Sequence, residues 1–302
     1  MQTRSSKLVP SEEALSGLRD GHTLIIGGSL FHNKPMRLVR DVIRRGVRDL
    51  SVIAVPQASI DVDLLIAAGC VAEIRVPYLG FEYLGLASNY RRHATEGRLR
   101  VWDCDETQLL TGLEAAAKNL PSGITKTGVG TDLPRINSDL KEIADPITGE
   151  PMIAVGAIRP DFALIHATWG DVYGNLAYAG YAFGDLLIAE ATNRSGGTVI
   201  ASVDEVVSNR RFNQDPFRTE VPHMLVDAVV ETPYGAYPCS SHGHYQYDEE
   251  HLADYVALSR AGDARVAEYL QAQVFDVVSQ DDYLDRFVKP SRLVALRKAI
   301  HV

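Results

Sequence analysis

The sequence predicts an α/β protein built on an open, doubly wound and mostly parallel sheet flanked by helices. Two features support this prediction. Short apolar segments with strand character alternate with segments of helical spacing through the first 120 residues, and the alternation resumes after residue 160. Alternating strands and helices are the pattern that builds parallel sheets with helices on both faces.

The first part of the chain supplies a series of predicted strands with helices between them. Helix 35–46 is the clearest, because Met36, Val39, Val42 and Ile43 fall on one face at helical spacing. Each strand is short and apolar, as expected for a strand that is buried on both faces. The strands are expected at 23–27, 50–55, 72–76 and 99–102, and the helices at 35–46, 61–69, 86–97 and 105–119.

Residues 121–151 depart from this pattern. They are rich in Gly, Thr, Asp and Pro and have few periodic apolar positions, so we expect a long irregular excursion of the kind that is usually functional. No repeat, low-complexity tract or linker interrupts the chain, and we interpret residues 1–302 as a single domain. Further strands are expected at 161–166, 198–203 and 225–230, helices at 185–193, 248–260 and 263–273, and a helical C-terminal tail at 280–299.

Charge and composition exclude several classes of protein. The chain has 30 Lys and Arg against 39 Asp and Glu, with no basic run, so we expect no nucleic-acid partner. No apolar run is long enough to span a bilayer and the N-terminus lacks the apolar core of a secretory signal, so we expect a cytoplasmic protein without membrane contact. The three widely spaced cysteines, and His242 and His244 without a third ligand, predict neither a disulfide framework nor a metal site.

Residues 20–35 carry the strongest chemical signal. A short apolar strand runs into Gly27 and Gly28, and a helix opens on a proline shortly afterwards. In an open α/β sheet such a turn lies at the carboxyl edge of the strands, where ligands bind. Its backbone N–H groups, with Asn33 and Lys34, could hold an oxyanion or a phosphate. The alternative is a tight turn without a ligand, and the third glycine of the dinucleotide fingerprint is absent.

The same segment resembles the signature of the alpha subunits of family I coenzyme A transferases: an Asp-Gly or Asn-Gly pair, an apolar strand, two glycines and a short loop that ends before proline. Two departures, Ser29 in place of phenylalanine and Asn33 in place of glycine, are similar to the glutaconate branch of that family. The resemblance extends over roughly residues 10–275. The blocks that carry it lie, in the family's order, at 20–35, 61–69, 78–82, 125–133, 159–175 and 240–251.

The resemblance implies an open α/β chain that acts with a similar beta-type chain, usually as an (αβ)2 heterotetramer with the active site between the chains. In such enzymes a glutamate, usually on the beta chain, attacks the thioester of an acyl-CoA and becomes covalently modified. The substrate is therefore a coenzyme A thioester, and no cofactor is permanently bound. This chain would supply the substrate pocket, with Gly27, Gly28, Ser29 and Asn33 among its binding residues.

A subset of the same family opens a cyclic diketone CoA ester with water and implies another role. There, a glutamate near a helix start of the alpha-type chain is important, and the matching residue is Glu106. A carboxylate at this position could act as a base toward water or toward an acidic carbon. The alternative is a helix-start carboxylate that only satisfies the first turn.

Four further residues are candidates for contacts with substrate or CoA. Ser59 follows a strand and could donate to a carboxylate, or it could cap the next helix. Phe81 and Glu82 lie in a loop after a strand, although Glu82 could equally be an acid at a helix start. Lys126 stands where the family usually has arginine and could bind an acyl carboxylate or a CoA phosphate as a point charge, or it could be a solvated loop lysine.

Three hypotheses follow. The first is CoA transfer between an acyl-CoA and a dicarboxylic or oxo acid, together with a beta chain. The second is a CoA-ester hydrolase or C–C bond lyase on the same scaffold, using Glu106 and water. The third is a non-catalytic binding subunit whose partner carries all the chemistry, because no carboxylate of this sequence has an unambiguous nucleophile signature.

Overall fold

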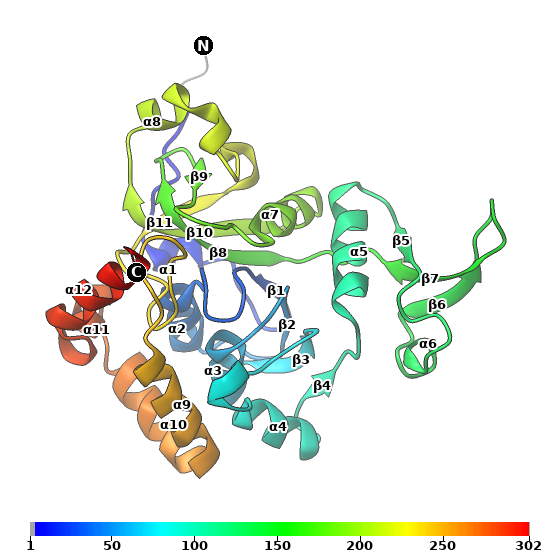
Figure 1. Cartoon of the computed structure of the whole chain (residues 1–302), viewed down its shortest axis with the longest axis horizontal. Helices are drawn as coiled ribbons and strands as arrows, with labels where there is room; N and C mark the ends of the chain where they lie inside the picture. Colours follow the sequence, from blue (N-terminus) through cyan, green and yellow to red (C-terminus); the bar gives the residue numbers. More distant parts are fainter. Residues whose placement is uncertain (1–3, 302) are drawn as a thin grey trace.

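The computed structural model describes residues 4–301 and contains a central sheet in the strand order β11-β10-β8-β1-β2-β3-β4 (Figure 1). All of these strands run parallel, and a short β9 pairs antiparallel with β8. The predicted mostly parallel α/β fold is therefore confirmed. The strands are β1 Thr23–Ile26, β2 Leu50–Ala54, β3 Val71–Arg75, β4 Arg100–Val101, β8 Phe162–Gly170, β9 Leu176–Ala177, β10 Thr198–Val206 and β11 Ala228–Glu231.

Helices cover both faces of the sheet. Along β1, Leu24 and Ile26 face one core while Ile25 faces the other, which explains why the strand reads as an uninterrupted apolar run. The first core packs against α2, α3 and α9 to α12, and the second packs against α5 and α7. The helices are α1 Ser11–Ala14, α2 Met36–Arg45, α3 Ile60–Ala67, α4 Ser88–Thr95, α5 Glu106–Ala117, α7 Asp185–Arg194, α8 Asn209–Gln214, α9 Glu249–Ala261, α10 Asp263–Leu270, α11 Gln280–Phe287 and α12 Pro290–Lys298.

Residues 4–301 also contain five shorter helical turns. No helix within this range is both long and apolar enough to cross a membrane. The segment η3 replaces the start of the strand that was expected at 225–230, so β11 begins three residues later. Neither β9 nor α8 was predicted, because each is too short to show a periodic pattern. The short turns are η1 Glu82–Leu84, η2 Pro216–Arg218, η3 His223–Leu225, η4 Gln271–Phe275 and η5 Ala299–His301.

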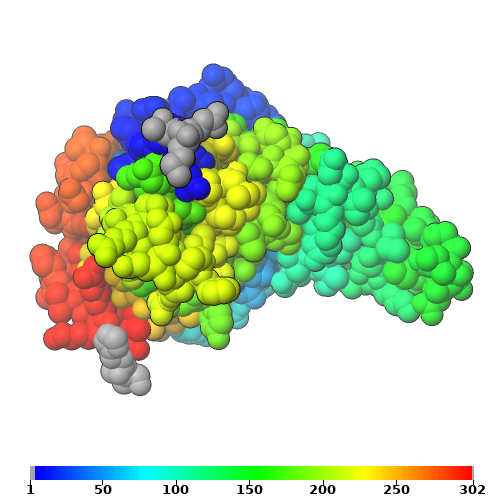
Figure 2. All heavy atoms as spheres, turned by 90° about the horizontal axis from the view of Figure 1, so that it is seen from above, coloured from blue at the N-terminus to red at the C-terminus, as the bar shows by residue number. Residues whose placement is uncertain are grey.

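The expected irregular excursion at 121–151 is corrected by the structure. This stretch forms an antiparallel sheet in the order β5-β7-β6, which projects from the main body (Figures 1 and 2). Its apolar positions are few because one face is exposed, yet Ile153 and Val155 are fully buried against α5. The elements are β5 Ser122–Thr125, α6 Leu133–Ile136, β6 Leu140–Ala144 and β7 Pro151–Gly156.

The C-terminal tail is helical, as predicted, and it is tied to α2. The buried guanidinium of Arg40 donates to the carbonyl oxygen of Tyr237 at 3.2 Å and to Oε1 of Gln280 at 2.9 Å. The same guanidinium lies 4.0 Å from the ring centroid of Tyr283. Burying a guanidinium is unfavourable unless its donors are satisfied, so these contacts fix α11 against the body.

Candidate functional site

The loop of residues 27–35 lies where the strand order of the central sheet reverses, between β1 and β8. Ligands of open α/β sheets bind at this position, beyond the carboxyl ends of the strands. Gly28 has a φ of 71°, and a Cβ on it would lie 2.4 Å from the carbonyl oxygen of His32. A Cβ on Gly27 would lie 2.2 Å from a carboxylate oxygen of Asp185. The turn therefore requires glycine at both positions.

Most of the loop's backbone donors are used inside the chain. The N–H of Gly27 donates to the carbonyl of Leu164 at 2.9 Å, and that of Gly28 donates to Oδ1 of Asp185 at 2.9 Å. The N–H of Ser29 donates to His32 within the loop, also at 2.9 Å. A ligand at this loop would therefore meet side chains rather than these N–H groups, contrary to the expectation that the glycine turn itself offers free donors.

Lys34 is fully buried beneath the loop. Its ammonium lies 3.1 Å from Oδ2 of Asp61, although the angle is not that of a hydrogen bond. It donates to the carbonyl oxygens of Gln57 at 2.7 Å and Gly28 at 3.3 Å. The expectation that Lys34 adds a donor for a ligand is corrected, because its charge is committed to holding three segments together.

The two candidate serines lie on neighbouring loops, Ser29 after β1 and Ser59 after β2. Ser59 is fully buried, and its hydroxyl donates to the carbonyl of Leu30 rather than capping α3. Ser29 is 7% exposed, and its hydroxyl lies 3.4 Å from Oε1 of Gln57. Ser59 thus joins the loops that follow β1 and β2, while Ser29 lies at their rim.

Asp185, the first residue of α7, is a site residue that the sequence analysis missed. Its side chain is fully buried, Oδ1 accepts the N–H of Gly28, and Oδ2 accepts the hydroxyl of Tyr178 at 2.7 Å. Burial raises the pKa of Asp185 to about 6, and these hydrogen bonds oppose the rise. An acid at a helix start gives no sequence signal beyond capping, and only the fold places it on the glycine turn.

Asn33 joins the loop to two distant segments. Its amide donates to the carbonyl of Tyr181 at 2.8 Å, and its Oδ1 accepts the N–H of His242 at 2.7 Å. The ring of His242 in turn accepts the N–H of Tyr181 at 3.0 Å through Nδ1. The buried amide, held at a φ of 54°, closes a ring of hydrogen bonds around the rim of the site.

Aromatic and imidazole rings gather on this rim. His32 stacks on Phe183 with centroids 5.8 Å apart, and its Nδ1 lies 2.6 Å from the hydroxyl of Ser240. Burial, the neighbouring His242 and the charge of Lys34 lower the pKa of His32 to about 4, so its ring is neutral at pH 7. The stacked rings of His32 and Phe183 therefore present a flat, uncharged surface at the rim.

Phe81 and Glu82 border the site from the loop after β3. Phe81 is fully buried, with its ring 6.2 Å from that of Phe31, so it supports the loop from the core side. Glu82 is exposed and has a φ of 49° at the start of η1. A backbone bridge between Ala58 and Leu79 places this segment beside the loop after β2.

Glu106 and Lys126 form a separate group. Glu106 is exposed at the start of α5, where Asp105 and Gln108 make the capping box, so the interpretation of Glu106 as the residue that satisfies the first turn is corrected. Lys126 is exposed and pairs with Glu150 at 2.6 Å on the projecting sheet. The side chain of Gln108 donates to the backbone of the Lys126 loop, but no interaction among residues 4–301 joins either candidate to loop 27–35.

The two histidines around Gly243 point into different surroundings. His242 lies against His32 and Tyr181, whereas His244 lies against Trp169 and Tyr245. Within the described part of the chain, no group of three or more potential ligand residues is arranged to hold a metal ion.

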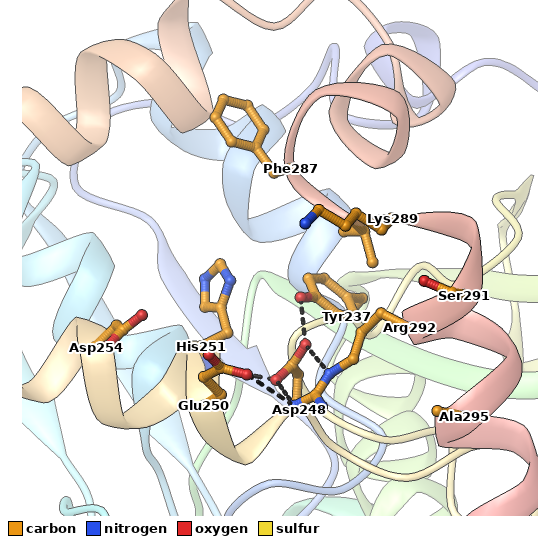
Figure 3. A pocket seen from close by; sticks show the side chains of 11 residues that line it. Tyr237, Asp248, Glu250, His251, Asp254, Phe287, Lys289, Ser291, Arg292 and Ala295 are labelled. Atoms are coloured by element: carbon orange, nitrogen blue, oxygen red, sulfur yellow. Dashed lines mark hydrogen bonds and ion pairs between the residues drawn. The ribbon is translucent and has the colours of Figure 1, made fainter.

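A cavity of about 480 Å³ between α9 and α12 contains a group of hydrogen bonds centred on Asp248 (Figure 3). Asp248 accepts the hydroxyl of Tyr237 at 2.7 Å and two hydrogen bonds from the guanidinium of Arg292, one of them at 2.9 Å. Burial would raise the pKa of Asp248, but these hydrogen bonds hold it below its ordinary value. They tie α12 to residues 237–248, the segment that carries His242.

Comparisons with known proteins agree on one family. A family model described as Coenzyme A transferase matches residues 10–232. The chain is 34% identical to the cholesterol ring-cleaving hydrolase IpdA subunit of Rhodococcus jostii, over 94% of this chain and 96% of that protein. It is also 34% identical to an uncharacterized protein of Archaeoglobus fulgidus, but it spans only 65% of that protein's length.

The fold has a close counterpart among solved structures. The crystal structure of glutaconate coenzyme A-transferase from Acidaminococcus fermentans matches with a TM-score of 0.91 and 28% identity, over 97% of this chain and 96% of the matched chain. In sequence, the A subunit of the glutaconate CoA-transferase of that organism is 29% identical over 97% of this chain and 95% of its own length.

A pair of glycine substitutions tests the glycine turn. Gly28 and Gly46 both have a φ of 71°, but a Cβ on Gly46 meets nothing within 4 Å. We expect Gly46→Ala to lower the free energy of unfolding by about 1 kcal/mol and Gly28→Ala to lower it by at least about 3 kcal/mol. Urea unfolding measures both, and equal losses would contradict the steric argument.

The raised pKa of Asp185 predicts a pH dependence of stability. Between about pH 4 and pH 6 the folded state holds a proton that the unfolded state has released, so the free energy of unfolding falls as pH rises through this window. Asp185→Asn is neutral throughout and keeps an acceptor for Gly28, so its unfolding free energy should fall less across the same range. Asp285→Asn, an exposed control, should keep the wild-type slope in urea unfolding from pH 4 to 7. An unchanged slope in Asp185→Asn would refute the assignment.

Proposed function

This chain belongs to the coenzyme A transferase family as an alpha-type subunit, and we propose that, with a beta-type partner, it moves CoA between an acyl-CoA and a dicarboxylic or oxo acid. The relatives support the existence of a partner. Two that match over nearly their whole length are subunits by name, and one of them is the A subunit of glutaconate CoA-transferase. We further propose an (αβ)2 assembly, in which the active site lies between the two chains.

The observation that carries this proposal is that the carboxyl groups bonded to loop 27–35 are buried and hydrogen-bonded. Within residues 4–301, those bonded to the loop belong to Asp61 and Asp185, and both are fully buried and held by internal partners. Neither can reach an acyl carbon. At the same sheet edge Tyr83 and Tyr181 are 67% and 73% exposed, so this surface is accessible to a second chain. The carboxyl groups bonded to the loop are therefore used to position it, and we propose that the partner supplies the nucleophile.

In the proposed reaction a carboxylate of the partner attacks the thioester carbonyl and CoA leaves as a thiolate, giving an acyl–enzyme anhydride. The thiolate then attacks the enzyme's own carbonyl, which releases the first acid and leaves an enzyme–CoA thioester; a second acid reverses both steps. We propose that the turn at Gly27 and Gly28 places Ser29 and Asn33 on the acyl side of this cleft. We assign Lys126 to its CoA side.

The residues after β2 and β3 complete this assignment. We propose that Ser59 and Phe81 keep the loop in position, since both are fully buried beneath it. Glu82 is exposed at the border of the cleft, and we assign it to the substrate-contacting surface.

Trapping of the covalent intermediate tests transfer. The purified pair of chains, incubated with an acyl-CoA and then with borohydride, should lose activity and carry a reduced glutamate on the partner, with no modification of this chain by mass spectrometry. A labelled second acid should gain CoA without net release of free CoA. Free thiol formed at the rate of substrate loss, without any trapped adduct, would rule out transfer.

A second candidate function is favoured by the free carboxylate of Glu106. Because Asp105 and Gln108 cap α5, Glu106 has no structural duty there, and it makes no hydrogen bond or ion pair within the described residues. The 34% identity to a ring-cleaving hydrolase subunit points the same way. In this reading Glu106 removes a proton from water, which then opens the CoA ester or a neighbouring C–C bond.

Replacement of Glu106 separates the candidates. If it is a general base, Glu106→Ala should slow hydrolysis by at least about 100-fold with an unchanged unfolding midpoint. The matched control is Glu114→Gln, on the same helix and exposed, where it pairs with Lys118. Full activity in Glu106→Ala would remove the hydrolase reading. If no acid of this chain's surface affects either activity when replaced singly, the chain is a non-catalytic binding subunit.

A further inference from the structure

A second cavity, of about 240 Å³, opens beside β9 and α8 at the carboxyl ends of β8 and β10. Its wall includes Trp169 at the end of β8, Tyr178 just after β9, and Arg211 and Phe212 of α8. None of these residues belongs to loop 27–35. The volume is below that of pockets for drug-sized ligands, so the cavity suits a small molecule.

The cavity combines flat apolar walls with one uncommitted cation. The indole of Trp169 is held by a hydrogen bond from Nε1 to Glu205 at 3.2 Å, and Phe212 is buried. The guanidinium of Arg211 lies 4.2 Å from the indole centroid, and within residues 4–301 no carboxylate pairs with it. Arg218, also in the wall, is already paired with Asp215 at 3.0 Å.

We propose that this cavity binds a small planar carboxylic acid, with its carboxylate on Arg211 and its ring or conjugated chain against Trp169 and Phe212. A guanidinium matches a carboxylate in two parallel hydrogen bonds, and the position of Arg211 over the indole restricts where its donors can lie. A phosphate is disfavoured because the carboxylate of Glu205, which accepts the indole N–H of Trp169, opposes a doubly charged ligand more than a singly charged one. The preference is therefore for one negative charge on a flat molecule.

The cavity is connected to the glycine turn through one side chain. The ring of Tyr178 lines the cavity, and its hydroxyl donates to Asp185 at 2.7 Å. The other oxygen of Asp185 accepts the N–H of Gly28. An acid in the cavity therefore packs against Tyr178, which positions Asp185 beneath loop 27–35. Binding of the acid does not depend on the proposed reaction.

Direct binding tests the inference, without any need for turnover. Isothermal titration of trans-cinnamate into the complex of this chain with its partner should show one binding site for each copy of this alpha-type chain. Cinnamamide, which has the same shape without the charge, and hexanoate, which carries one charge on a flexible chain, should each bind at least about tenfold more weakly. No binding of cinnamate by the wild-type complex at about 10 mM would overturn the proposal.

Matched variants locate the site. Arg211→Gln should weaken cinnamate binding at least about tenfold, whereas Arg210→Gln, also an exposed position of α8 but outside the cavity wall, should leave it within about twofold. Arg211→Lys keeps the charge and should retain part of the affinity. If Arg211→Gln binds like wild type, the acid sits elsewhere and the proposal fails. Unchanged urea unfolding of each variant shows that the fold is intact.

Discussion

The conformation of the site depends on one buried ion pair, between Lys34 and Asp61. Neither side chain is exposed, and the ammonium also donates to carbonyl oxygens of Gln57 and Gly28. Moving two charges out of water is so unfavourable that such pairs contribute little net stability, and we interpret this one as fixing geometry instead. It locks the loop after β1 to the loop after β2, and both lie at the sheet edge where ligands bind.

Around this pair the backbone is held in conformations that side chains rarely adopt. Leu30, Asn33 and Phe183 have φ values of 49°, 54° and 52°. Such residues persist only where the surroundings over-determine them. The ring of hydrogen bonds through Asn33 and the buried carboxylate of Asp185 supply that constraint, so the rim is a preformed surface rather than a flexible loop.

In the proposed function, the preformed rim is one part of a catalytic centre that a partner completes. Its buried carboxyl groups are used for positioning, His32 is neutral, and Tyr83 and Tyr181 remain exposed. The C-terminal helices also stabilise the rim, because Arg292 of α12 donates to Asp248 in the segment that bears His242. In the proposed function, a scaffold of this kind orients a substrate toward groups that the partner supplies.

The sequence alone determined the α/β class, nearly all the strands and helices of the central sheet, and the family resemblance. These follow from local patterns: alternating apolar segments, and glycines where the chain turns without room for a Cβ. Local patterns did not reveal the projecting sheet at 122–156, whose short strands are half exposed.

Only the tertiary structure decided which residues meet. It showed that Lys34 is buried, that Asp185 holds Gly28 across 157 positions of sequence, and that Glu106 leaves the capping of its helix to Asp105. Each of these outcomes depends on which segments the sheet order brings together. Burial and long-range partners, rather than residue type, then decide whether a charged side chain serves the fold or a ligand.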